Sequence, residues 1–165
     1  GGIPVKVDVK LTGVDGVLKT LSSLPAEVVS KRGGPVKAAL AKGARFLRDR
    51  ERDNLRAVLE PGDESTGLLE QNIIASRGKP PSSGRGERYL VRVKRKMYPG
   101  RKGEQVSTLK SAQIKEYGSA KQPARSFIRK TVQQHGGQTI EIVTKDLAAR
   151  VQKIVAKLAG QSRGR

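Results

Sequence analysis

The side chains that could do chemistry in this sequence are few and scattered. His135 is the only histidine and there is no cysteine, so disulfides and thiolate metal sites are excluded. No acidic cluster lies near His135 in the sequence. We therefore expect a surface histidine and not a metal ligand or an acid–base group. The glycines match neither a phosphate-binding loop nor a dinucleotide-binding fingerprint.

Three acids occur close together in the stretch RFLRDRERDN. Asp49, Glu51 and Asp53 alternate there with arginines, and alternating signs along a helix are typical of an exposed face with ion pairs. We therefore expect these three acids to lie on a solvated helix face and not to act as paired catalytic carboxylates. A nuclease would need clustered acids or histidines for a metal ion. The sequence therefore predicts no catalytic, cofactor-binding or metal-binding residues and a protein that is not an enzyme.

Positive charge is the dominant feature of the composition. The net charge of +19 draws the chain to polyanions such as nucleic acid, acidic proteins or anionic membrane. Residues 77–103 hold ten Lys or Arg and a single acid, Glu87. They predict a long basic hairpin or loop that contacts DNA phosphate or an acidic partner; a mobile solvated loop is the alternative. Tyr89 and Tyr98 are too few for a stacking platform. The candidate contacts are Arg85, Arg88, Arg92, Lys94, Arg95, Lys96, Arg101 and Lys102.

The elements that must position these residues follow from apolar spacing. A length of 165 residues and 35% hydrophobic content suit one domain, residues 1–165, with one modest core. Alternation predicts strands, and spacings of three or four residues predict helices. The predicted strands are residues 3–11, 73–77, 89–98 and 107–117. The predicted helices are residues 14–24, 36–59, a short one from Phe127 that ends at Gly136, and 140–158.

Together these elements predict an α+β fold. Two or three helices should pack on one face of a small antiparallel sheet. Ser126 is the expected N-cap of the short helix, and residues 160–165 should form a flexible basic tail. No apolar run reaches the roughly 20 residues that span a bilayer, so we expect no membrane segment. The first ten residues do not have the pattern of a signal peptide, and the lack of cysteine suits assembly inside a cell.

The stretch EYGSAKQPARSF, residues 116–127, carries many marked residues but no obvious chemistry. As structure, Tyr117 and Gly118 would end a strand, Pro123 would stiffen the loop and Phe127 would anchor the next helix. As function, Lys121 and Arg125 would project from a rigid turn toward a neighbouring subunit. The two interpretations are compatible.

This stretch also resembles a family signature. EYGS followed by ARSFIRKTV is similar to the pattern E-[FY]-G-[TS]…A-R-P-F-[LI]-R-P of phage tail-completion proteins, the small neck proteins of long-tailed bacteriophages. The opening VKVDVKLTGVDGVLKTLSSLP, the helix through AKGARFLRDRERDN and the element STGLLEQNI resemble other parts of that family in the same order. Ser126 and Lys130 stand where the family usually has prolines. Residues 77–103 look longer than the family's corresponding segment.

The resemblance implies a structural virion protein without enzymatic activity. Such a protein forms a homo-oligomeric ring, expected to be a hexamer, that completes the tail and joins it to the head connector, with DNA passing through the lumen. Its partners would be tail tube and connector proteins, and its location the virion neck after assembly in the host cytoplasm. Tail-terminator and connector-side roles both stay open. The motif positions carried over are structural or interfacial: Glu116, Tyr117, Gly118, Ala124, Arg125, Phe127, Thr66, Gly67 and Leu68.

A different class of function is consistent with the charge alone. A basic nucleic-acid-binding protein of ribosomal or nucleoid type would have the same excess of Lys and Arg, although no recognition motif for nucleic acid is present. Tight binding that weakens steeply with salt would favour this alternative. Assembly with a tail protein that does not depend on salt would favour the neck protein.

Overall fold

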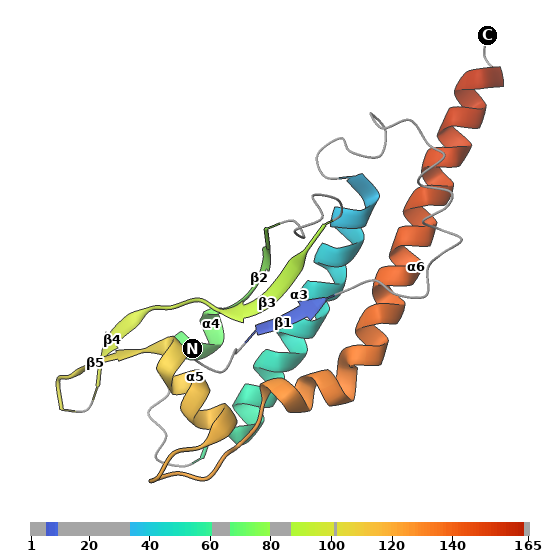
Figure 1. Ribbon diagram of the computed structural model, residues 1–165. Helices are drawn as coiled ribbons and strands as arrows, with labels where there is room; N and C mark the ends of the chain where they lie inside the picture. The colour runs from blue at the N-terminus through green and yellow to red at the C-terminus, as the bar shows by residue number, and fades with distance from the viewer. Residues whose placement is uncertain (1–5, 10–33, 61–66, 80–86, 101, 164–165) are drawn as a thin grey trace.

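The computed structural model describes residues 6–9, 34–60, 67–79, 87–100 and 102–163. It has the α+β architecture expected from the sequence: helices pack against a small antiparallel sheet (Figure 1). The helix predicted at residues 14–24 lies outside the described residues, as do Thr66, Arg85 and Arg101.

Helix α3, Gly34–Val58, is the central element of the fold. Its apolar residues recur at helical spacing, and Leu40, Ala44, Leu47 and Leu55 are all at most 2% exposed. The three-stranded sheet packs on one side of α3 and the C-terminal helix on another (Figure 1). The predicted helix at 36–59 is therefore confirmed, and its two-sided packing explains why its apolar face is broad.

The main sheet has the strand order β1-β3-β2 and is antiparallel throughout. Its strands are β1 (Lys6–Val9), β2 (Ile73–Arg77) and β3 (Tyr89–Val93). Val91 pairs with Val7 on one side and Ala75 on the other, and its side chain is fully buried. The strand expected at 73–77 is thus confirmed, and so are residues 6–9 of the strand expected at 3–11; the rest of that strand lies outside the described residues. Because β3 is the central strand, residues 77–103 are not a separate insertion; they include part of the core.

A second, two-stranded sheet follows in the chain. The strand predicted at 89–98 is in fact two strands, because Lys94–Lys96 separate β3 from β4 (Met97–Pro99). Strand β4 pairs with β5 (Gln105–Ser107), Met97 opposite Ser107 and Pro99 opposite Gln105. This hairpin projects away from the body of the protein (Figure 1). The expectation of one long basic hairpin is corrected to two shorter ones, β2–β3 and β4–β5.

Residues 108–117 form a helix, and the strand predicted at 107–117 is wrong. Helix α5 spans Thr108–Tyr117, and the Ser107 hydroxyl caps it by accepting the Lys110 N–H at 3.0 Å. Ala112 of α5 is fully buried. The serine cap and the buried alanine one turn further on outweigh the weak alternation in this stretch. The brief element expected after Gly67 is the single-turn helix α4, Leu68–Gln71.

The C-terminal helix α6 runs without interruption over Ile128–Arg163. The predicted break at Gly136–Gly137 is therefore wrong. Of the flexible tail expected at residues 160–165, residues 160–163 continue the helix, and the last two lie outside the described residues. Val143, Leu147 and Val151 are at most 4% exposed, and their packing on α3 holds the helix together across the glycine pair. Figure 1 shows that α6 bends after its first turns. A pair of glycines permits such a bend without ending a helix.

Helices α3 and α6 approach closely at Gly43. A Cβ atom at this position would lie 2.3 Å from Val143 Cγ2 and 3.4 Å from the Thr139 carbonyl oxygen. At Gly137 of α6, by contrast, no atom lies within 4 Å of the added carbon. The crossing of the two helices therefore requires glycine at position 43. Position 137 has room for a side chain.

We expect Gly43→Ala to lower the free energy of unfolding by about 1–3 kcal/mol, because the overpacked methyl group pushes the helices apart. The matched variant Gly137→Ala should raise it by about 0.5–1 kcal/mol, since alanine favours a helix over glycine. Urea unfolding followed by circular dichroism measures both. Adding Val143→Ala to Gly43→Ala should recover part of the loss; a Gly43→Ala protein as stable as the wild type would contradict the close approach.

Candidate functional site

The EYGSAKQPARSF stretch folds into a clasp, which we define as Glu116–Gly118 together with Arg125–Arg129. Glu116 is 1% exposed and lies in the last turn of α5. Its carboxylate accepts the backbone N–H groups of Phe127 at 2.9 Å, Ile128 at 2.8 Å and Arg129 at 2.9 Å. These are N–H groups that the start of a helix leaves without intrahelical partners. Glu116 thus caps α6 from another helix.

The expected N-cap of this helix was Ser126, and that prediction is wrong. The Ser126 hydroxyl donates to Glu116 Oε1 at 2.8 Å, so it supports the cap instead of forming it. The Arg129 side chain closes the arrangement: its Nε donates to Glu116 Oε1 at 2.9 Å and its Nη2 to the Glu116 carbonyl at 2.7 Å. Its guanidinium carbon lies 4.7 Å from the centre of the Tyr117 ring, a cation–π contact.

Two residues of the clasp, Gly118 and Arg125, connect it to the rest of the fold. Gly118 has a φ of 78°, in the region that favours glycine, and a Cβ there would lie 2.8 Å from the Ala124 nitrogen. The Arg125 N–H donates to the Lys115 carbonyl at 2.7 Å. Its guanidinium donates to the Val58 carbonyl at 2.7 Å, at the end of α3. Three helix ends therefore meet at this clasp.

The clasp also fixes the protonation of Glu116. Burial by itself would raise the pKa of this carboxyl group. The hydrogen bonds from the Arg129, Ile128 and Phe127 backbone and from the Ser126 hydroxyl outweigh burial and hold the pKa of Glu116 below its usual range. The carboxylate is therefore charged at neutral pH, as an N-terminal cap requires.

The proposed interface residues differ in how far a partner could reach them. The side chains of Glu116 and Phe127 are buried, at 1% and 0% exposure, and act within the subunit. Lys121 is exposed in the turn between α5 and α6, whereas Tyr117 and Arg125 are half-buried. Gly67 has a φ of 76° and precedes α4, whose first residue is the half-buried Leu68.

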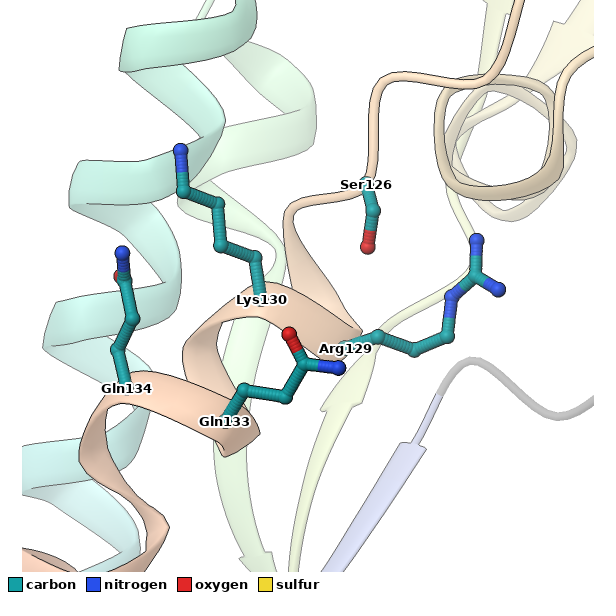
Figure 2. Close-up of a pocket in the computed structure, with 5 residues that line it drawn as sticks. All are labelled: Ser126, Arg129, Lys130, Gln133 and Gln134. Atoms are coloured by element: carbon teal, nitrogen blue, oxygen red, sulfur yellow. The ribbon is translucent and has the colours of Figure 1, made fainter.

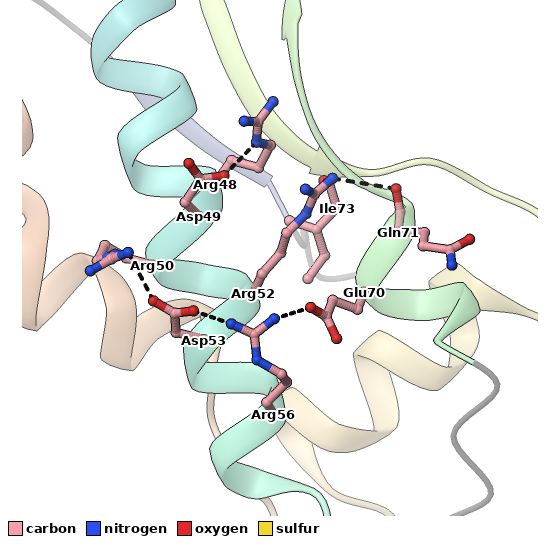
Figure 3. Close-up of polar contacts among 9 residues, drawn as sticks. All are labelled: Arg48, Asp49, Arg50, Arg52, Asp53, Arg56, Glu70, Gln71 and Ile73. Atoms are coloured by element: carbon pink, nitrogen blue, oxygen red, sulfur yellow. Dashed lines mark hydrogen bonds and ion pairs between the residues drawn. The ribbon is translucent and has the colours of Figure 1, made fainter.

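Five charged residues of α3 form the expected ion pairs (Figure 3). Asp49 pairs with Arg48 at 2.9 Å, and Asp53 bridges Arg50 and Arg56. Arg52 donates to the Ile73 carbonyl at 2.7 Å, which ties α3 to β2. The expectation of solvated ion pairs is confirmed for Asp49 and Asp53.

Glu51 does not belong to this face, and the prediction of solvent exposure for it is wrong. It is 1% exposed, and neither carboxylate oxygen has a hydrogen-bond partner among the described residues. Burial raises the pKa of Glu51 to about 8, and the Glu116 carboxylate adds to the shift. The sequence did contain a signal: Leu47, Glu51 and Leu55 are spaced by four residues, which places Glu51 on the apolar face.

No arrangement for catalysis is found in the part of the chain that the structure describes. His135 is half-buried and contacts Phe46 edge to face, with 6.0 Å between ring centres. Those residues include no group of three or more metal-ligating side chains. An open pocket of about 500 Å³ lies beside the first turns of α6 (Figure 2). Its lining contains no acid: Ser126, Arg129, Lys130, Gln133 and Gln134.

The basic candidates from 77–103 are divided between two places. In the β2–β3 hairpin, Arg92 donates to the Ser76 hydroxyl at 3.0 Å, Arg77 is paired with Glu87, and Arg88 is half-buried. In the second place, Lys94, Arg95, Lys96 and Lys102 are exposed in and next to the β4–β5 hairpin. The basic residues near the main sheet therefore contact other groups of the protein, whereas those near the projecting hairpin are exposed.

A buried threonine, which the sequence reasoning missed, holds the start of the projecting hairpin. Thr108 is 0% exposed. Its hydroxyl donates to the Lys94 carbonyl at 2.7 Å and accepts the Lys96 N–H at 2.9 Å, while its own N–H donates to the Lys96 carbonyl at 2.9 Å. No local pattern predicts this contact, because the partners are 12 to 14 residues apart.

Comparison with protein-family models, curated proteins and solved structures gives no match for this chain. Among the described helices, none is long and apolar enough to cross a membrane. The assignment of a function therefore depends on the site geometry and on the resemblance of the motifs.

Proposed function

We propose that this chain is a structural protein of the phage neck that assembles as a homo-oligomeric ring, completes the tail and joins it to the head connector. The observation that carries the proposal is the clasp. Glu116, Tyr117, Gly118, Arg125 and Phe127 carry the resemblance to tail-completion proteins, and all of them meet where α5, α6 and α3 are joined. The spacing of the motif thus has a structural role in this chain, which supports the proposal.

The surface suits a protein that works by assembly. The β4–β5 hairpin projects from the body, and Met97 on it is 50% exposed. The subunit is small, so contacts with neighbouring copies would add apolar burial that its own core cannot supply. We propose a ring of six subunits that contacts tail tube and connector proteins, with duplex DNA passing through the lumen of the virion neck.

Electron microscopy and native mass spectrometry of the purified chain test this proposal. We expect closed rings of one size, and antibodies against the chain should label the neck of virions. Met97→Glu on the projecting hairpin should shift the population toward monomers, while the monomer keeps the circular dichroism spectrum of the wild-type subunit. A chain that stays monomeric at all concentrations and is absent from virions would overturn the proposal.

The exposed Lys and Arg side chains in and next to the β4–β5 hairpin favour a second candidate function, a nucleic-acid-binding protein of ribosomal or nucleoid type. Such a protein would bind duplex or single-stranded nucleic acid as a monomer, and its affinity would fall steeply with salt. Sedimentation at several salt concentrations, with and without DNA, separates the two. Rings that persist in high salt without DNA favour the neck protein, and a monomer that sediments only with DNA favours this alternative.

A further inference from the structure

The segment Lys94–Lys96 presents three consecutive basic side chains without a partner among the described residues. All three side chains are exposed and make no ion pair or side-chain hydrogen bond within the described residues. Several arginines elsewhere are engaged: Arg52 with the Ile73 carbonyl, Arg129 with Glu116 and Arg150 with Asp146. Part of the positive charge of the body is therefore neutralised locally, and the turn differs from the other exposed Lys and Arg residues in carrying three of them in succession.

The backbone of this segment is fixed before any partner binds. Thr108 forms hydrogen bonds with the Lys94 carbonyl and with both the N–H and the carbonyl of Lys96. The Lys94 N–H in turn donates to the Asn72 carbonyl at 2.7 Å. A turn that is held at both ends loses little backbone entropy on binding, and such preorganisation strengthens a contact.

We propose that the basic turn, defined as Lys94, Arg95 and Lys96, binds the phosphate backbone of duplex DNA without reading its sequence. Lys102 on the adjoining hairpin and Lys110 on the adjoining helix are also exposed. The turn itself offers three cations and no aromatic side chain, and the neighbouring Tyr98 is half-buried, with its hydroxyl bound to Ser111. That composition fits phosphates of a duplex better than the bases of a single strand.

This inference deepens the proposed function, because duplex DNA would cross a neck ring, but it holds for a single subunit as well. Acidic protein surfaces also attract cations. A regular duplex, however, carries one charge per about 1.7 Å of axis. Three consecutive basic side chains can therefore each contact a phosphate. We therefore assign the turn to DNA, and binding to an acidic polypeptide becomes an outcome of the test.

Fluorescence anisotropy with a labelled duplex of mixed sequence, over a series of KCl concentrations, measures the contact. The test variant is Lys94→Gln/Arg95→Gln/Lys96→Gln. Its control removes the same charges, one arginine and two lysines, from exposed positions of α3 and α6: Arg45→Gln/Lys153→Gln/Lys157→Gln. Both variants have the same net charge, so a difference between them reflects position and not total charge.

The test variant should lose about tenfold or more in affinity at 0.1 M salt. Its salt slope, the change in log K per log salt, should fall by about 2–3, since each phosphate contact contributes about 0.9. The control should keep the wild-type slope. Thr108→Val should weaken binding at unchanged charge and Thr108→Ser should restore it. Equal losses in both triple variants would overturn the proposal in favour of diffuse attraction.

Two further outcomes separate this inference from the proposed function. Polyglutamate that binds as tightly as the duplex, with the same loss in the test variant, would assign the turn to an acidic protein and overturn the DNA contact. Rings without duplex binding would reject the inference but leave the neck protein standing. Duplex binding by a strict monomer would support the inference and reject the ring.

Discussion

Glu116→Ala is expected to lower the free energy of unfolding by about 3–5 kcal/mol, among the largest effects that one substitution in this chain can have. The carboxylate accepts three consecutive backbone N–H groups at the start of α6 and pairs with Arg129. Alanine leaves these donors buried without a partner, and each such donor costs about 1–3 kcal/mol. Urea unfolding at pH 7 measures the loss.

Two variants show whether the loss comes from the cap. Glu116→Gln keeps one acceptor oxygen but no charge, so it should lie between the wild type and Glu116→Ala. Glu141→Ala removes an exposed carboxylate that pairs with Lys145 on the same helix, and it should leave stability unchanged. If Glu116→Ala unfolded no more easily than Glu141→Ala, the capping role of Glu116 would be rejected.

The same carboxylate makes the free energy of unfolding fall at acid pH, which we call the acid limb of the stability curve. The pKa of Glu116 is lowered in the folded state, so above pH 4.5 both states are ionised and the folded state gains from the cap. As the pH falls below 4.5, the unfolded chain takes up a proton first, and stability is lost. Glu116→Gln should lack this part of the acid limb when unfolding is followed between pH 2 and 5.

The elements that were predicted correctly are those whose pattern is local. Helix α3 was found because its apolar residues keep one face over many turns, and β2 because a short apolar run is bounded by turn residues. Helix α5 was missed because it is short and mostly polar. Its start depends on the Ser107 cap, and its single fully buried apolar residue is Ala112. Periodicity is a weak signal in such a segment.

The clasp was recognised as a motif but not as a mechanism. Sequence spacing shows that Glu116 precedes Phe127 by eleven residues, but it cannot show that the chain turns back so that the carboxylate meets the start of α6. That return depends on the positive φ of Gly118 and on the hydrogen bond from Arg125 to Lys115. Tertiary caps of this kind can be inferred only when the helix ends are already placed.

The second large effect concerns Glu51, whose burial makes stability fall as the pH rises. Its pKa is about 8 in the folded protein against an ordinary value of 4.5. Between these values the folded state retains a proton that the unfolded state has lost, so the free energy of unfolding decreases with pH. Each pKa unit corresponds to about 1.4 kcal/mol, which gives a total loss of about 4–5 kcal/mol between pH 4.5 and 8.

Glu51→Met should remove this dependence, because methionine fills a similar volume and has no charge to bury. The variant should match the wild type near pH 5, and it should be more stable by several kcal/mol at pH 8. Urea unfolding at pH 5, 6, 7, 8 and 9 measures the difference.

Glu51 and Glu116 act in separate pH windows, which makes the result easy to assign. Glu116 affects stability below pH 4.5, and Glu51 above it. Glu141→Gln, at an exposed position of α6, should follow the wild-type curve between pH 5 and 9. The decisive quantity is the slope between pH 5 and 8: a Glu51→Met protein with the wild-type slope would mean that Glu51 is solvated in solution. If the free energy of unfolding of Glu51→Met does not change over this pH range, Glu51 is a neutral acid inside the core of the wild type at physiological pH.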